Sequence, residues 1–139
     1  RGRVVTPIPP DVAAAIVAAG HSLSAEPLPS VGYGRAQWEW HSGAAIAPRW
    51  SVSVGSFSYR SDRGSSTRET AREALLGALA NFAATLDASE RMARVEWKRL
   101  RNPHGKERAL LDADACAKRA ADVRALAAQV AAMWPEVTP

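Results

Sequence analysis

The sequence of 139 residues has little of the chemistry that stabilises secreted proteins or spans membranes. Its single cysteine, Cys116, excludes an internal disulfide. It contains no run of about 18 apolar residues, and no apolar segment precedes a small-residue cleavage site, so we expect neither a transmembrane helix nor a secretory signal. These absences favour a reducing compartment, and we expect the protein to be cytoplasmic.

Groups that carry out catalysis are also sparse. The three histidines, His21, His41 and His104, stand far apart, and none has the spacing of a zinc-binding pair. Cys116 has no histidine near it in sequence that could activate it as a nucleophile. The Gly-x-Ser-x-Gly nucleophile motif, the phosphate-binding loop and the dinucleotide-binding pattern are missing. We therefore expect a non-enzymatic protein without a metal ion or cofactor.

The sequence is rich in alanine, arginine and tryptophan. Apolar residues make up 47% of the chain and many are alanine, so we expect a thin core anchored by the five tryptophans. The length predicts a single domain over 1–139, with the proline-rich residues 1–10 as an extended arm. The net charge is +4, and arginine, the dominant cation, suits planar contacts with phosphate or carboxylate. A GC-rich genome would also enrich arginine and alanine.

A short helix is predicted near the N-terminus. Asp11 is placed to cap a helix over 12–19, and Gly20 suits the left-handed residue that follows a helix. The residues expected to face inward are Val12, Ile16 and Val17.

A small antiparallel sheet should follow. The prolines and glycines of 21–34 predict a loop with at most a short edge strand at 21–23. Alternating apolar residues predict strands over 35–41 and 49–58, joined as a hairpin. Its apolar face should carry Trp38, Trp40 and Trp50.

Two long helices should form the C-terminal part. Residues 66–69 (Ser-Thr-Arg-Glu) fit a capping box, which predicts a helix start. The apolar seam that follows consists of Leu75, Leu79, Phe82 and Leu86. The sequence Asp-Ala-Ser-Glu at 87–90 resembles a second cap and favours a break or kink there. Asn-Pro-His-Gly at 102–105 should end the segment.

A last helix is predicted over 107–134, with mostly small residues on one face. These are Ala109, Ala113, Cys116, Ala120, Val123, Ala127, Val130 and Trp134. Small residues let two helix axes approach closely, so we predict an antiparallel helical hairpin. The expected fold class is α+β.

Two groups of basic residues are candidate binding sites. The first, the helix-start cluster, combines arginines with hydroxyl groups at the predicted helix N-terminus, where anions are favoured. Its members are Arg60, Arg63, Ser65, Ser66, Arg68 and Arg72. The alternative interpretation is a solvated loop with an ordinary helix cap.

The second candidate is the basic segment 91–108. Arg91, Arg94, Lys98 and Arg101 recur at spacings of three, four and three and so share one helical face. Such a row could follow a nucleic-acid backbone through phosphate contacts, while Trp97 could stack on an unpaired base. Alternatively, Trp97 continues the apolar seam into the core, and neighbouring glutamates neutralise part of the face.

These features predict non-enzymatic binding to DNA or RNA. The alternative is a small adaptor or inhibitor, for example encoded by a phage or mobile element, that docks on an acidic surface of a partner protein through arginine and tryptophan. The alanine-lined helices could also serve a homodimer.

One local resemblance accompanies the first hypothesis. A strand, a polar loop and a Gly-Ser-Ser-Thr-x-Glu helix start are similar to the sheet-to-helix step of small double-stranded-RNA-binding-like domains, including HicB-type antitoxins. The resemblance covers about 35 residues and lacks the lysine-rich second helix start and a matching third strand. It therefore assigns no role to any residue.

Overall fold

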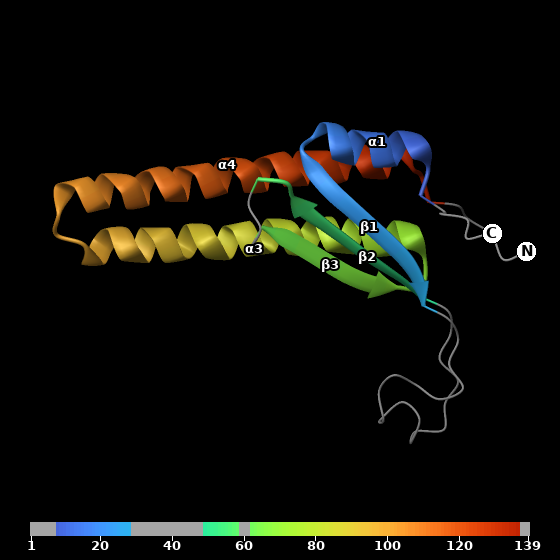
Figure 1. The fold of residues 1–139 in the computed structure, drawn as a ribbon, viewed down its shortest axis with the longest axis horizontal. Helices are drawn as coiled ribbons and strands as arrows, with labels where there is room; N and C mark the ends of the chain where they lie inside the picture. Colours follow the sequence, from blue (N-terminus) through green and yellow to red (C-terminus); the bar gives the residue numbers. More distant parts are fainter. Residues whose placement is uncertain (1–7, 29–48, 59–61, 137–139) are drawn as a thin grey trace, which may run out of the picture.

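The computed structural model describes residues 8–28, 49–58 and 62–136 and shows an α+β fold (Figure 1). The elements are helix α1 (Pro10–Ala18), strands β1 (His21–Leu28), β2 (Arg49–Ser56) and β3 (Arg63–Arg68), and helices α3 (Ala71–Arg99) and α4 (Pro103–Met133). Helices α3 and α4 form a long antiparallel hairpin, and the sheet and α1 lie against one half of it. The predicted class, with its N-terminal helix, small sheet and helical hairpin, is confirmed.

The sheet is antiparallel, with β2 between β1 and β3. Val52 of β2 pairs with Ala25 of β1 and with Ser66 of β3. Because side chains alternate along a strand, Val52 and Val54 point to one face, where both are fully buried. The opposite face is rich in serine: Ser22, Ser24, Ser51, Ser53 and Ser65.

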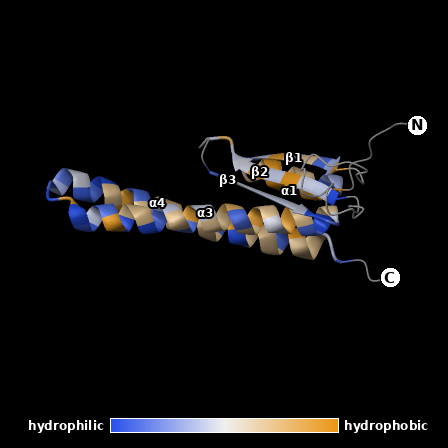
Figure 2. Cartoon of the chain, turned by 90° about the horizontal axis from the view of Figure 1, so that it is seen from below, coloured by the Kyte–Doolittle hydropathy of each residue, from blue (hydrophilic) through white to orange (hydrophobic). Residues whose placement is uncertain are grey.

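The core lies between the sheet and the helical hairpin. The strongly apolar residues gather there, whereas the far end of the hairpin is mostly hydrophilic (Figure 2). The predicted seam of α3 is buried in full: Leu75, Leu79, Phe82 and Leu86. Helix α4 contributes Val123 and Val130 from its predicted stripe. The periodic spacing therefore identified the inner faces of both long helices.

Helix α3 lies unusually close to β3. A Cβ added at Gly64 would be 2.3 Å from both the carbonyl oxygen of Ala78 and the amide nitrogen of Phe82. Only glycine leaves room for the helix backbone at this point. The side chain of Asn81 on α3 also donates a hydrogen bond of 2.7 Å to the carbonyl oxygen of Ser65, which covers part of the backbone of β3.

The N-terminal helix differs from the prediction at its start. It begins at Pro10, not at residue 12, because proline fits the first helical position, where no N–H is needed. Asp11 therefore lies inside the helix, and Val17 faces solvent. The positive φ of 90° at Gly20 confirms the predicted helix end. Ile8 is already buried in the core, so the predicted arm over 1–10 does not extend to this residue.

The sheet also differs from the prediction. The edge strand predicted at 21–23 exists, but it extends further than predicted: β1 runs over His21–Leu28. The predicted strand over 35–41, with Trp38 and Trp40, lies outside the described residues. Strand β2 confirms the strand predicted over 49–58, and its Trp50 packs against the core.

The start of α3 was predicted wrongly. The capping box expected at 66–69 does not form, because these residues belong to or follow strand β3. Thr70 caps the helix instead, with its Oγ1 accepting from the amide of Glu73 at 3.1 Å. The break expected at 87–90 is also wrong, since α3 is continuous over this stretch. Asp87 pairs with Arg124 of α4, so its carboxylate does not cap a new helix.

Helix α4 starts earlier than predicted. Asn102 is its cap, with its side-chain oxygen accepting from the amides of His104 at 2.8 Å and Gly105 at 3.3 Å. Pro103 occupies the first helical position, so the Asn-Pro-His-Gly sequence begins a helix as well as ending a turn. In the described part of the chain, no helix has the length and apolar character needed to cross a lipid bilayer.

Candidate nucleic-acid interface

The helix-start cluster is not assembled by its described members. Arg63 and Arg68 stand at the two ends of β3, about 16 Å apart at an ordinary strand rise. Their spacing of five residues also sends them to opposite faces of the sheet. Ser65 is exposed, whereas Ser66 is buried and its hydroxyl has no hydrogen-bond partner in the described structure. Arg60 lies outside the described residues.

The true N-terminus of α3 is an acidic environment. Arg72, the last member of the cluster, donates from Nε to the carbonyl oxygen of Trp134. A pocket of about 480 Å³ lies here between Trp50 and Trp134. Its charged lining residues are Glu69, Arg72, Glu73 and Glu136. Three carboxylates against one guanidinium do not favour an anion in this pocket, and the phosphate site expected at the helix start stays a prediction.

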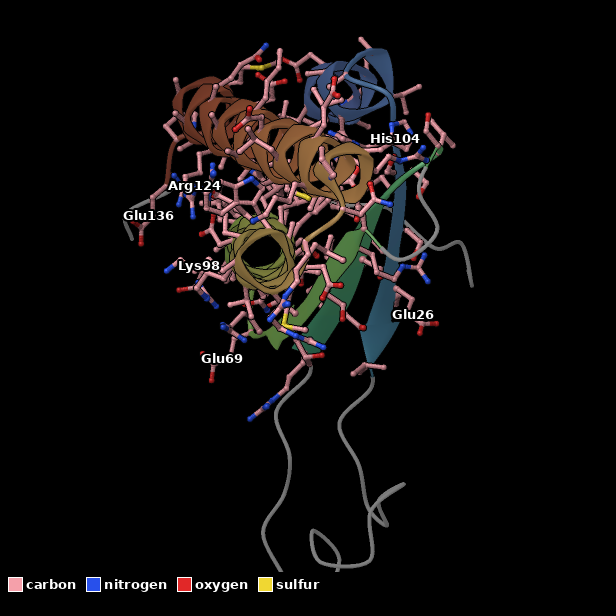
Figure 3. All side chains as sticks on the ribbon, turned by 90° about the vertical axis from the view of Figure 1, so that its left-hand side faces the viewer. Glu26, Glu69, Lys98, His104, Arg124 and Glu136 are labelled. Carbon is pink, nitrogen blue, oxygen red and sulfur yellow. The ribbon has the colours of Figure 1, made fainter. Side chains whose placement is uncertain are left out.

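The basic segment 91–108, in contrast, forms the free end of the helical hairpin (Figure 1). It contains seven basic and two acidic side chains, a net charge of +5, whereas the whole chain carries +4. Arg91, Arg94 and Lys98 lie on α3 and share a face, and Arg101 follows in the turn. Lys98 points to the side of the hairpin away from the sheet (Figure 3). The positive charge of the chain is therefore concentrated where the fold projects.

Two of these cations are held by carboxylates. Arg94 pairs with Glu90 at 2.9 Å and with Asp114 of α4 at 3.3 Å. The hydrogen bond that Arg94 donates to Glu90 is the main reason why the pKa of Arg94 is raised above its usual value. Arg99 pairs with Glu96 at 3.4 Å. Four further cations make no ion pair with a described residue: Arg91, Lys98, Arg101 and Arg108.

Trp97 is neither a core residue nor a free aromatic surface. Its side chain is 39% exposed. The ammonium of Lys106 lies 4.4 Å from the centre of its ring and donates to its carbonyl oxygen at 2.6 Å. This cation–π contact joins α3 to α4 near the turn. The predicted burial of Trp97 is therefore wrong, and its ring already has a cationic partner.

Apolar side chains are also exposed on this end of the hairpin. Met92 is 71% exposed, and Val95 and Leu111 are exposed as well. Met92 and Val95 each have a charged neighbour in the sequence, whereas Leu111 follows Leu110, which is also exposed. Isolated exposed apolar residues are common on protein surfaces and do not by themselves indicate an interface.

His104 lies at the start of α4 on the projecting end, whereas His21 lies at the other half of the molecule, at the start of β1. His21 packs edge-on against Phe82, with 5.1 Å between the ring centres, and burial lowers its pKa. It lines a pocket of about 220 Å³ with Asp62 and Arg119, which form an ion pair of 2.9 Å. Cys116 is buried on the stripe of α4. Within residues 8–28, 49–58 and 62–136, no three metal-ligating side chains gather in one place.

Sequence reasoning missed the ion pairs that join distant segments. Asp62 binds Arg119 and Asp87 binds Arg124, across 57 and 37 residues of chain. Nothing local marks these pairs, since each depends on how α4 lies against the rest of the fold. Comparisons with protein-family models, with curated proteins and with solved structures found no match.

Proposed function

We propose that the protein binds nucleic acid non-enzymatically, through phosphate contacts made by the basic segment 91–108. The observation that carries the proposal is the group of four cations without an ion pair on the projecting end: Arg91, Lys98, Arg101 and Arg108. Arginine and lysine on a surface of this kind attract a polyanion and displace its condensed counterions. Binding needs no change in the fold, because these side chains already face solvent.

The number of unpaired cations sets the expected salt dependence. Four phosphate contacts on a duplex give a slope of about −3.6 for log K against log salt. Raising the salt from roughly 50 to 200 mM should therefore weaken binding about a hundredfold. A fall of less than about fivefold over this range would show that phosphate contacts do not dominate the binding.

The best test replaces two of the unpaired cations and compares the loss of affinity with the loss caused by replacing two cations elsewhere in the fold. The variant Arg91→Gln with Lys98→Gln should bind a mixed-sequence duplex about 50-fold more weakly at roughly 100 mM salt, and its salt slope should fall by about half. The matched variant Arg63→Gln with Arg68→Gln removes the same charge from β3. It should lose far less affinity, because these two residues lie outside the projecting end. A larger loss of affinity in Arg63→Gln with Arg68→Gln than in Arg91→Gln with Lys98→Gln would favour β3 over the basic segment as the binding surface.

An acidic partner protein is the second candidate. The exposed Met92, Val95 and Leu111 favour it, because protein interfaces combine arginine with apolar contacts. In this case Met92→Ser with Leu111→Ser should abolish capture of the partner and leave affinity for nucleic acid unchanged. Partner binding should also survive a change from roughly 50 to 200 mM salt better than phosphate binding does.

A further inference from the structure

The contact between Lys106 and Trp97 bears on the kind of nucleic acid that the basic segment would accept. Proteins that hold single strands without sequence preference combine a basic groove with aromatic rings on which bases stack. Each stacked base contributes about 5-fold to 150-fold in affinity. A basic surface without a free ring forgoes this contribution.

Trp97 is the only tryptophan, tyrosine or phenylalanine in the segment 91–108. The Lys106 ammonium 4.4 Å from its ring centre occupies a position that a base would need in order to stack from that side. The hydrogen bond of 2.6 Å from the same ammonium to the Trp97 carbonyl oxygen holds it in place. One face of the only such ring in the segment is therefore already occupied by a cation, although Trp97 is 39% exposed.

Three of the four unpaired cations, Arg91, Lys98 and Arg108, also stand on helices. Arg91 and Lys98 are seven residues apart on one helix, which places their Cα atoms about 10 Å apart along its axis. That distance corresponds to about three nucleotides of rise along one strand of a duplex. Helix α3 is continuous through both residues, so the spacing between their backbone positions is fixed. A regular double helix presents phosphates at equally fixed positions, whereas a flexible single strand must be ordered first.

We infer that the basic segment binds double-stranded nucleic acid through its phosphate backbone and discriminates against single strands. This inference rests on the proposed function and specifies its ligand. A duplex has about twice the axial charge density of one strand, and each contact with it releases more counterion. For four contacts at roughly 50 mM salt, this difference alone favours the duplex about tenfold.

The test measures binding of the full chain to fluorescein-labelled oligonucleotides of mixed sequence at roughly 50 mM salt. The probes are a DNA duplex, an RNA duplex and the corresponding single strands, each followed by fluorescence anisotropy. We expect both duplexes to bind about tenfold tighter than their single strands. A preference for the duplexes below about threefold would overturn the inference, and a difference between the two duplexes would show which backbone is favoured.

The variant Trp97→Leu provides an independent test of stacking. Its affinity for a single strand should stay within about twofold of the unmodified protein, whereas loss of a stacked base would lower it at least about fivefold. Circular dichroism would check that the helical hairpin is intact, and the comparison of duplex with single strand needs no variant. If neither form binds at low salt, the proposed function fails. If single strands bind as well as duplexes, only the inference about the ligand fails.

Discussion

Gly64 is the position at which the structure predicts the largest effect of a single methyl group. It lies on β3 opposite Val54, with its Cα directed towards α3. The new Cβ of Gly64→Ala would lie 2.3 Å from two backbone atoms of α3 and 2.8 Å from the Cα of Phe82. None of these atoms can move without the helix. Ordinary contact would require α3 to shift by about 1 Å, which would open gaps beside the buried Val52 and Val54.

We expect Gly64→Ala to lower the free energy of unfolding by about 3 kcal/mol, at the upper end of the usual cost of overpacking. The midpoint of thermal unfolding should fall by roughly 10 °C. Gly55→Ala is the matched control, because Gly55 pairs with Arg63 in the same sheet but directs its Cβ position to the side chain of Arg63 at 3.3 Å. The nearest atom is the Arg63 Cβ, and the guanidinium nitrogens follow at 3.4 and 3.5 Å, so the new methyl group needs a shift of only a few tenths of an ångström. This variant should therefore change stability by less than about 1 kcal/mol.

Urea unfolding followed by far-ultraviolet circular dichroism would measure both variants. The close approach of α3 to β3 would be refuted by a Gly64→Ala protein whose stability lies within about 1 kcal/mol of the Gly55→Ala protein. A lower free energy of unfolding whose slope against urea concentration is unchanged would support the close approach, because the same surface would still be exposed on unfolding.

Three further predictions concern other contacts. Thr70→Ala should cost about 1 kcal/mol in urea unfolding because it removes the cap of α3, whereas Ser66→Ala should be neutral or stabilising because its buried hydroxyl has no partner. Burial lowers the folded-state pKa of His21, so the unfolded chain binds the proton more tightly. The free energy of unfolding should therefore fall as the pH drops below about 6.5. His21→Leu should reduce this dependence of stability on pH between roughly pH 7.5 and 5. Asp62→Ala should cost about 2 kcal/mol, because it leaves Arg119 without its buried carboxylate; an unchanged thermal midpoint would exclude a stabilising ion pair.

The sequence predicted those parts of the fold whose pattern is local. The four large residues of the α3 seam recur every three or four positions, and all of them are buried. This spacing needs no knowledge of the partner, because any helix with such a stripe must cover it. The cap of α4 was present in the sequence as well, but Asn102 and Pro103 were interpreted as an end, since the same residues also favour turns.

Strand β3 could not be predicted in the same way. Its inner face carries Gly64 and Ser66, which have no apolar surface to mark a buried position. They are buried because α3 lies close to them, and this contact depends on the tertiary arrangement. Residues 66–69 and 70–73 both have the Ser/Thr-x-x-Glu pattern, and only the second caps the helix. With β3 assigned to a loop, the arginines at its two ends were placed together at a helix start that lies further along the chain.

The row of cations in the basic segment is also a local pattern, and α3 carries Arg91, Arg94 and Lys98 on one helix as the spacing predicted; its role in binding stays a prediction. The sequence could not show which of these cations are already paired. Arg94 meets Asp114 across 20 residues, on a helix whose register against α3 is set by packing. Arg91 and Lys98 have the same local spacing but make no ion pair of this kind in the described structure. The hydrogen bond from Arg124 lowers the pKa of the Asp87 carboxyl, and the charge of Arg91 adds to this effect. Of the four cations in the predicted row, the ion pairs therefore leave Arg91, Lys98 and Arg101 as candidates for phosphate contacts.

The unpaired cations and the large buried residues of the core lie at different ends of the hairpin. Outside 91–108 the chain has eleven basic and twelve acidic residues, and two ion pairs of the described structure join distant segments there: Arg119 with Asp62, and Arg124 with Asp87. At the projecting end, packing of Ala93, Ala109 and Ala113 along the seam holds the helices together, and the unpaired cations contribute little to stability. Arg91→Gln with Lys98→Gln should therefore unfold at the same urea concentration as the unmodified protein. A weakened interaction with nucleic acid in this variant would then report on the binding surface and not on the fold.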